Sequence, residues 1–164
     1  MKTIKDSPLN WLGGKKYLKK VIIPKIPKHK CYVECMCGAA WIFFAKEPSE
    51  VEVINDIDDQ LINFFRVVKT VPDALKYELA WDLVSRELFQ QYRQELVDYP
   101  DLDSVRKAKN FYYVLKCSFG GMRQTFGYGK TRKPSLNFKR VDRIIHDVYE
   151  RLIHVYVGIL TMRT

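Results

Sequence analysis

The stretch Cys31–Asp59, CYVECMCGAAWIFFAKEPSEVEVINDIDD, predicts two strands joined by a turn and a helix. CYVEC has the β-branched and aromatic residues of a short buried strand, and VEVIN predicts a second strand that ends at Asp56. Gly38 permits a sharp turn after the first strand. AAWIFFAK then predicts a helix that Pro48 ends. The stretch is therefore typical of a βαβ unit, which places the chain in the α/β class.

Two carboxylates and the glycine turn make this unit a candidate ligand site. In a βαβ unit, backbone N–H groups at the turn and a carboxylate ending the second strand frame a pocket for a nucleoside. Asp56 holds that position, with a helix N-cap as its alternative role. Glu34 is a carboxylate near the end of a predicted buried strand, where it needs a partner. We expect it either to face the cofactor cleft and pair with a cation there, or to form a salt bridge with a neighbouring lysine.

The charge of this 164-residue chain is unevenly distributed. The formal net charge is +9, but residues 1–30 carry +8 and residues 105–143 carry +10, so the remainder sums to −9. Two basic blocks on an acidic remainder predict a polyanionic partner, most simply nucleic acid. A membrane surface is a weaker interpretation, because neither block forms a clean amphipathic helix.

Length and cysteine content bound the class of protein. The length suits one domain, with room for a small appended lobe. No apolar run approaches the roughly 18 residues that a membrane span needs, and the N-terminus lacks the apolar region of a signal peptide. Four cysteines without an export signal favour reduced thiols. We therefore expect a cytoplasmic protein.

Most of the remaining sequence predicts helices, and VYVGIL near residue 160 predicts a third strand. Asp58 or Asp59 is placed to cap the helix after the βαβ unit, and Pro72 to begin the next one. Apolar residues repeat at helical spacing in three stretches: Tyr17, Leu18, Val21 and Ile22; Leu61, Ile62, Phe65 and Val68; and Ala108, Phe111, Tyr112 and Leu115.

The pattern changes at residues 119–138, FGGMRQTFGYGKTRKPSLNF, which have no regular period. Such a long irregular segment is uncommon in a small domain unless it binds something. It mixes cations suited to phosphates with aromatic rings suited to base stacking. We favour a nucleic-acid-binding role over the alternative, an irregular lobe packed by its own aromatic residues.

The pattern His29, Cys31, Cys35 and Cys37 has the residue types of a metal site, but not the geometry. Four residues along a strand would separate Cys31 from Cys35 by about 13 Å, at roughly 3.3 Å per residue. One zinc ion cannot bridge that distance without destroying the strand. We therefore predict no metal, and expect the thiols to be buried and to behave as small apolar residues.

Taken together, the motifs resemble the adenine-specific DNA methyltransferases of the GATC-methylating type, particularly phage-associated members. SPLNWLGGKKYL is similar to the family's N-terminal motif, and YVECMCGAAWIFF to its YVEPF-x-G-G motif. VEVINDIDDQLINFFRVVK is similar to the segment that holds the cofactor ribose, and FYYVLKCSFGGMRQTFGYGKTRKPSLNF to the recognition lobe. The resemblance covers nearly the whole chain, with the four motifs in the family's order.

The resemblance implies roles for individual residues. Trp11 and Lys15 would lie on the methionine and adenine side of S-adenosylmethionine, and Asp56 would hold the ribose hydroxyls. Glu34, Gly38 and Ala39 would form the turn beside the cofactor. The residues implied to contact DNA are Arg123, Gln124, Tyr128, Lys130, Arg132 and Lys133.

The chain departs from the family's turn motif at two positions. Cys35 stands where the family has proline, and Ala40 stands where it has the second glycine. A Cβ at Ala40 is tolerable if φ is negative there, but costly if the turn needs a positive φ.

The implied fold is a partial Rossmann-like S-adenosylmethionine-dependent methyltransferase domain with an inserted, mainly α-helical DNA-recognition lobe. Residues 1–70 would form the cofactor-binding part and residues 71–142 the lobe. Residues 143–164 would return to the methyltransferase domain, which would remain incomplete.

The implied function is site-specific methylation of adenine N6 in double-stranded DNA, as in restriction-modification, with S-adenosylmethionine as the donor. In the family, an Asp-Pro-Pro-Tyr or Asn-Pro-Pro-Tyr motif holds the flipped adenine, and neither occurs in the 164 residues. We therefore expect a truncated enzyme without catalytic residues and with impaired or no activity as this chain alone. The alternative is a DNA-binding remnant with no cofactor role. A dinucleotide-dependent oxidoreductase is disfavoured because G-x-G-x-x-G is absent.

Overall fold

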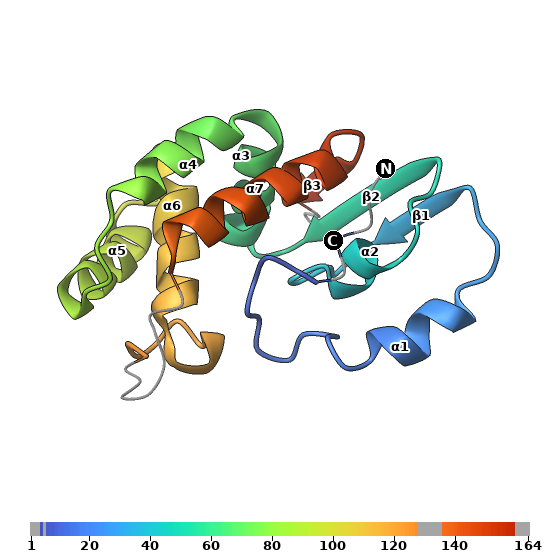
Figure 1. Ribbon diagram of the computed structural model, residues 1–164, viewed down its shortest axis with the longest axis horizontal. Coiled ribbons are helices and arrows are strands. Elements are labelled where there is room, and N and C mark those ends of the chain that lie inside the picture. Colours follow the sequence, from blue (N-terminus) through green and yellow to red (C-terminus); the bar gives the residue numbers. More distant parts are fainter. Residues whose placement is uncertain (1–3, 5, 128–135, 160–164) are drawn as a thin grey trace, which may run out of the picture.

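The computed structural model describes residues 4, 6–127 and 136–159. Its described part contains a sheet of three parallel strands with the order β1-β2-β3 (Figure 1). The chain is therefore a mixed α/β protein, as its sequence predicts. The strands are β1 (Cys31–Glu34), β2 (Val51–Asp56) and β3 (Tyr156–Ile159).

Helices make up most of the rest of the described chain. Strands β1 and β2 lie at one end of the molecule, and helices α3 to α7 gather toward the other (Figure 1). The α-helices are α1 (Lys19–Ile22), α2 (Trp41–Ala45), α3 (Asp59–Thr70), α4 (Pro72–Ala80), α5 (Arg86–Asp98), α6 (Ser104–Cys117) and α7 (Phe138–Leu152). The 3-10 helices are η1 (Ile23–Lys25) and η2 (Phe119–Gly121).

One hydrophobic core joins the sheet to helices α2, α3, α6 and α7. Ile54 of β2, Phe44 of α2 and Ile145 of α7 are all fully buried in it. Phe64 of α3 stacks on Tyr112 of α6, with ring centroids 5.3 Å apart. The apolar stripes predicted for α3 and α6 are buried at every position. Hydrophobic periodicity therefore identified the faces that form this core.

The starts of α3 and α4 also agree with the sequence. Of the two candidate caps for α3, Asp58 is the one used: its Oδ1 accepts a hydrogen bond from the Leu61 amide at 3.1 Å. Pro72 is the first residue of α4, where its missing N–H costs nothing.

The predicted N-terminal helix is wrong in extent. Only Lys19–Ile22 are α-helical, and a 3-10 turn containing Pro24 ends the segment. Tyr17 is 86% exposed, and Leu18 and Val21 are each 54% exposed, so most of the apolar stripe is not covered by the described chain. A single helical turn is too short to bury such a face. Helical spacing of apolar residues therefore does not by itself predict a buried helix here.

The expectation that β1 is buried is also wrong. Cys31 and Cys35 are exposed, and Val33 is 50% exposed. Because β1 is an edge strand, only its alternate residues face the helices. Val51 and Tyr156 are exposed on the same face of the sheet as Val33, so this face is uncovered by the described residues. Of the three cysteines in the predicted pattern, Cys37 alone is buried as expected; Cys117 of α6 is buried as well.

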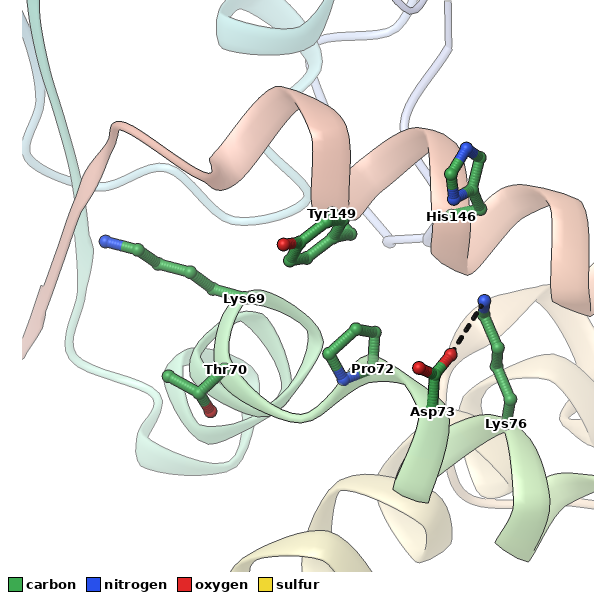
Figure 2. Close-up of a pocket in the computed structure, with 7 residues that line it drawn as sticks. All are labelled: Lys69, Thr70, Pro72, Asp73, Lys76, His146 and Tyr149. Atoms are coloured by element: carbon green, nitrogen blue, oxygen red, sulfur yellow. Dashed lines mark hydrogen bonds and ion pairs between the residues drawn. The ribbon is translucent and has the colours of Figure 1, made fainter.

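A polar pocket lies where the corner between α3 and α4 meets α7 (Figure 2). Its cations already have partners: Lys69 donates to the Val155 carbonyl at 2.7 Å, and Lys76 pairs with Asp73 at 3.2 Å. None of the residues predicted to bind cofactor or DNA lines this pocket. Its lining is Lys69, Thr70, Pro72, Asp73, Lys76, His146 and Tyr149.

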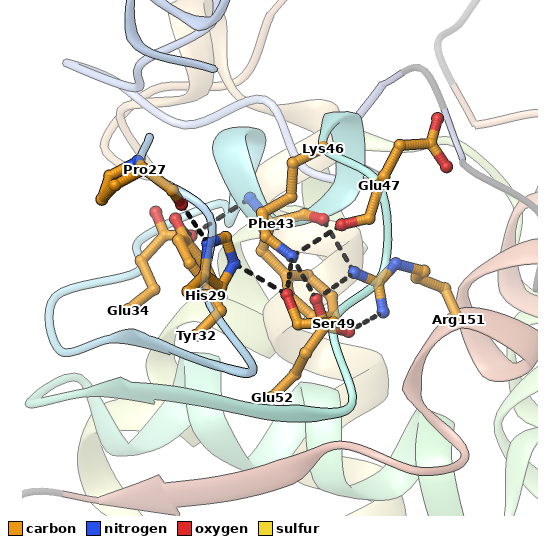
Figure 3. A network of polar contacts seen from close by, with 10 residues as sticks. All are labelled: Pro27, His29, Tyr32, Glu34, Phe43, Lys46, Glu47, Ser49, Glu52 and Arg151. Atoms are coloured by element: carbon orange, nitrogen blue, oxygen red, sulfur yellow. Dashed lines mark hydrogen bonds and ion pairs between the residues drawn. The ribbon is translucent and has the colours of Figure 1, made fainter. Parts of the chain in front are cut away.

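A buried ionic network connects α7 to β2 and α2 (Figure 3). The Arg151 side chain is fully buried and donates to both carboxylate oxygens of Glu52. It also donates to the Phe43 carbonyl at 3.0 Å, and its guanidinium lies 3.9 Å from the centre of the Phe43 ring. Lys46 of the segment after α2 pairs with the same carboxylate at 2.5 Å. The buried Glu52 carboxylate therefore pairs with two buried cations, Arg151 and Lys46.

Glu52 remains ionised in this setting because of its partners. Burial disfavours the charged carboxylate, but the hydrogen bonds and charges of Arg151 and Lys46 outweigh it and hold the pKa of Glu52 below its usual value.

The predicted division into a cofactor part, a lobe and a return segment remains a prediction. The boundary expected between residues 142 and 143 falls inside α7, which is one continuous helix. Helix α6 of the predicted lobe shares its core with α3 of the predicted cofactor part.

We predict that Glu52→Gln lowers the free energy of unfolding more than Arg151→Met does. The first change leaves two buried cations without a carboxylate, and breaking a buried pair in this way costs about 3–5 kcal/mol. The second leaves the neutral pair of Lys46 and Glu52, so its cost is smaller. Urea unfolding followed by circular dichroism measures both. Equal losses, or a larger loss for Arg151→Met, would contradict this role for Glu52.

Candidate functional site

The carboxyl ends of β1 and β2 lie side by side, and a turn at residues 35–40 leads from β1 into α2. The Cys37 amide donates to the Asn55 carbonyl at 2.9 Å, and the Gly38 amide donates to Oδ2 of Asp56 at 2.7 Å. Gly38 has a φ of +51°, which suits glycine. The turn is thereby held against the end of β2, as the βαβ prediction requires.

Asp56 holds this turn and retains acceptor capacity on both carboxylate oxygens. Its Oδ2 accepts from Gly38, and its Oδ1 accepts from the Asp58 amide at 3.1 Å. An ionised carboxylate offers about four acceptor positions, so each oxygen can accept a further hydrogen bond. The alternative role of Asp56 as a helix cap is excluded, because Asp58 caps α3.

The N-terminal loop packs onto the same turn. The Trp11 ring lies against Gly38, within 3.4 Å of where a Cβ on Gly38 would be. Gly14 lies so close to the Trp41 indole that a Cβ on it would be 2.8 Å from Nε1. A side chain at position 14 would push the N-terminal loop away from α2, and this steric limit is the reason for a glycine at this position.

Lys15 and Glu34 form an ion pair beside the turn. Lys15 Nζ lies 3.2 Å from Oε1 of Glu34 and donates to the Met36 carbonyl at 3.2 Å. Oε2 of Glu34 accepts from the Phe43 amide at 3.1 Å and from the Tyr32 hydroxyl at 3.3 Å. Burial raises the pKa of Glu34, and Lys15 and these hydrogen bonds only partly oppose that shift. The sequence left two partners open for Glu34, a cation of the cofactor cleft or a neighbouring lysine. Lys15, a lysine beside the predicted cofactor turn, fits both descriptions.

Five of the six predicted cofactor residues therefore converge. We name this group the turn site: Trp11, Lys15, Glu34, Gly38 and Asp56. The sixth, Ala39, is part of the turn, but it is 1% exposed and its side chain belongs to the core.

The predicted DNA residues are less fully described. Arg123 lies next to the turn site, with its guanidinium 5.1 Å from the centre of the Trp11 ring. The Gln124 carbonyl accepts a hydrogen bond from Arg93 at 2.7 Å. Their contact with DNA stays a prediction. The other four, Tyr128, Lys130, Arg132 and Lys133, lie outside the described residues.

Sequence reasoning missed the second role of Asp58. Besides capping α3, its Oδ2 pairs with Arg123 at 3.1 Å. The sequence signal for this role is the position of Asp58 two residues after Asp56. Side chains just beyond the end of a strand gather at the same edge of the sheet, so Asp58 is expected near the turn site. The partner Arg123 lies 65 residues away, so no local pattern could identify the pair.

Within residues 4, 6–127 and 136–159, no group of three or more histidine, cysteine or acidic residues is arranged to hold a metal ion. No helix in that part of the chain is long and apolar enough to cross a membrane.

Comparison with known proteins gives a family match over most of the chain. A family profile described as D12 class N6 adenine-specific DNA methyltransferase matches residues 11–155. This range includes all six predicted cofactor residues and all six predicted DNA residues.

Individual relatives match at lower identity. The DNA adenine methylase of Salmonella typhi is 30% identical over 140 residues, 80% of this chain and 48% of that protein. The DNA adenine methylase of Escherichia coli K12 is 28% identical over 137 residues, 77% of this chain and 48% of that protein. The type II methyltransferase M.MjaIII of Methanocaldococcus jannaschii is 25% identical over 170 residues, 85% and 59% of the two chains. The chain thus spans about half the length of the first two relatives.

We predict that Ala40→Gly is less destabilising than Ala39→Gly by about 1–2 kcal/mol, the cost of the left-handed conformation for a residue with a Cβ. Both alanines are buried and lose the same methyl group, but Ala40 alone of the two has a positive φ, +53°. Urea unfolding of the two variants checks this. Equal destabilisation would show that the turn does not strain Ala40.

Proposed function

Because the chain belongs to the D12 class of N6 adenine-specific DNA methyltransferases, we propose that it provides S-adenosylmethionine binding and DNA binding for methylation of adenine N6 in duplex DNA. The observation that carries the proposal is the turn site, where Asp56 is fixed by two backbone amides and keeps free acceptor positions. Bound S-adenosylmethionine would supply the methyl group.

The turn site matches the chemistry of this cofactor. Asp56 accepts hydrogen bonds from ribose hydroxyls, which are donors. The Lys15 side chain is 40% exposed and supplies a cation for the carboxylate of the methionine moiety. Trp11 is partly buried and offers an aromatic face for adenine or the sulfonium group.

The proposed DNA contacts rest on charge. Residues 105–143 carry a net charge of +10 and include the segment after α6. Cations bind phosphates without reading sequence. The two DNA adenine methylases named above support duplex DNA as the substrate, and GATC is the first target to test.

The 164 residues contain neither Asp-Pro-Pro-Tyr nor Asn-Pro-Pro-Tyr. In the proposed reaction the adenine amine attacks the methyl group directly, so catalysis depends on holding the base in position. We therefore expect these residues alone to bind but to transfer methyl groups slowly or not at all. This same absence favours the second candidate, a DNA-binding remnant in which the cofactor has no role.

We predict that the protein binds S-adenosylmethionine and that Asp56→Asn weakens binding about 10- to 100-fold, the cost of losing hydrogen bonds to a charged acceptor. Isothermal titration calorimetry measures both affinities. Asp59→Asn is the matched control, because Asp59 lies three residues away and its carboxylate pairs with Lys107 of α6. It should bind as the wild type does.

NAD serves as the competing ligand in the same assay and should not bind. Failure of the wild type to bind S-adenosylmethionine would contradict the cofactor proposal and leave the DNA-binding remnant.

We predict that duplex DNA affinity falls steeply with salt, and that neutralising Lys130, Arg132 and Lys133 together lowers the slope of log affinity against log salt by about 2.7, at roughly 0.9 per phosphate contact. Fluorescence anisotropy with a GATC duplex measures it. The control removes the same charge from Lys20, Lys25 and Lys28. An equal effect of both triple variants would show a general charge effect rather than contacts by the predicted lobe.

A further inference from the structure

Residues 117–127, after the end of α6, form a short hairpin that we call the 117–127 hairpin. The Gly127 amide donates to the Cys117 carbonyl at 2.7 Å, and the Phe119 amide donates to the Thr125 carbonyl at 2.9 Å. Ser118 and Phe126 form an antiparallel bridge. The irregular sequence of this part therefore has a defined backbone.

Arg123 at the tip of the hairpin contacts Trp11 of the turn site and three residues next to the site. Its guanidinium lies 5.1 Å from the centre of the Trp11 ring and 5.4 Å from that of Phe111. It also pairs with Asp58 at 3.1 Å and donates to Gln60 at 3.4 Å. The side chain is one-third exposed, so these contacts are only partly shielded from water.

The backbone of Arg123 is strained. Its φ is +60°, and Arg123 and Ala40 are the non-glycine residues with positive φ in the described chain. Such strain persists only where the surrounding structure imposes it, and here the guanidinium contacts Trp11 and Asp58.

The contacts continue from Arg123 to the ligand-binding turn. Asp58 pairs with Arg123, its amide donates to Asp56, and Asp56 accepts from the Gly38 amide. A second contact lies at the base of the N-terminal loop, where Gly121 approaches Asn10 so closely that a Cβ on it would be 2.2 Å from the Asn10 carbonyl oxygen. The hairpin therefore touches the N-terminal loop that carries Trp11 and, through Asp58, the segment that follows β2.

We propose that Arg123 is a positioning residue that latches the 117–127 hairpin onto the turn site, so that cofactor binding and hairpin order are coupled. The inference rests on the proposed function, since it takes S-adenosylmethionine as the ligand. A ligand that packs on Trp11 restricts one of the two groups that hold Arg123. A ligand that bonds to Asp56 restricts the other group, Asp58, through the hydrogen bond between the Asp58 amide and Asp56. Each event then lowers the cost of the other, which is reciprocal coupling between two sites.

The test combines hydrogen–deuterium exchange of the hairpin with calorimetric titration of S-adenosylmethionine. Arg123→Gln removes the charge and the planar fork, whereas Arg123→Lys keeps the charge for Asp58 but loses the stacking. Arg93→Gln is the matched control, because Arg93 anchors the same hairpin through the Gln124 carbonyl rather than through a residue of the turn site.

In the wild type, we expect S-adenosylmethionine to slow exchange of the Phe119 and Gly127 amides. Arg123→Gln should speed their exchange without ligand and weaken cofactor affinity about fivefold or more, the low end of typical couplings, with Arg123→Lys intermediate. Arg93→Gln should also speed exchange but leave cofactor affinity within about twofold, which separates the latch from general loosening of the hairpin.

Two results would overturn the inference in distinguishable ways. If the wild type binds S-adenosylmethionine but hairpin exchange does not change and Arg123→Gln binds equally well, the latch is wrong while the proposed function stands. If the wild type does not bind S-adenosylmethionine at all, the cofactor part of the proposed function fails, and the coupling fails with it.

Discussion

The pairing of Arg151 with Glu52 is the interaction on which the rest of the structure depends. The two residues are 99 positions apart, and both are almost completely shielded from water. A guanidinium in that position is stable only beside a carboxylate, so α7 has one acceptable place against β2. Strand β3 follows α7 directly and pairs with β2. The same carboxylate pairs with Lys46 just after α2. Glu52 therefore connects the βαβ unit to α7.

The sheet that results brings together two carboxylates with different surroundings. Asp56 is bonded by backbone amides of the Gly38 turn and of the loop before α3. Glu34 is more deeply enclosed, so its charge depends on Lys15, which the N-terminal loop brings to it. A single cation therefore connects the first 15 residues to the end of β1. The turn site is built from the N-terminal loop, the ends of two strands and the turn after β1, and Arg123 of the 117–127 hairpin contacts its Trp11.

The chain spans about half the length of the DNA adenine methylases that it matches. Parallel sheets are normally covered on both faces, yet in the described residues Val33, Val51 and Tyr156 remain exposed on one face. Within the turn site, Lys15 pairs with Glu34, and the Gly38 amide bonds to Asp56. We accordingly propose binding of cofactor and DNA for these residues separately from transfer of the methyl group.

The sequence by itself determined the βαβ unit, the buried stripes of α3 and α6 and the Asp58 and Pro72 helix starts, because each depends on local periodicity or turn chemistry. Short motifs predicted the residues that converge at the turn site, and their contact with a cofactor stays a prediction. Sequence reasoning failed for the stripe around Tyr17 and for the burial of Cys31, since spacing shows which residues share a face and not whether anything covers it. Only the tertiary structure decided that Glu52 neutralises Arg151 and Lys46, that Ala40 has a left-handed backbone, and that Arg123 reaches Asp58. These features join residues that are distant in sequence or depend on the exact path of a turn. Which charged residues are buried together is set by how the whole chain folds, so no local pattern predicts it.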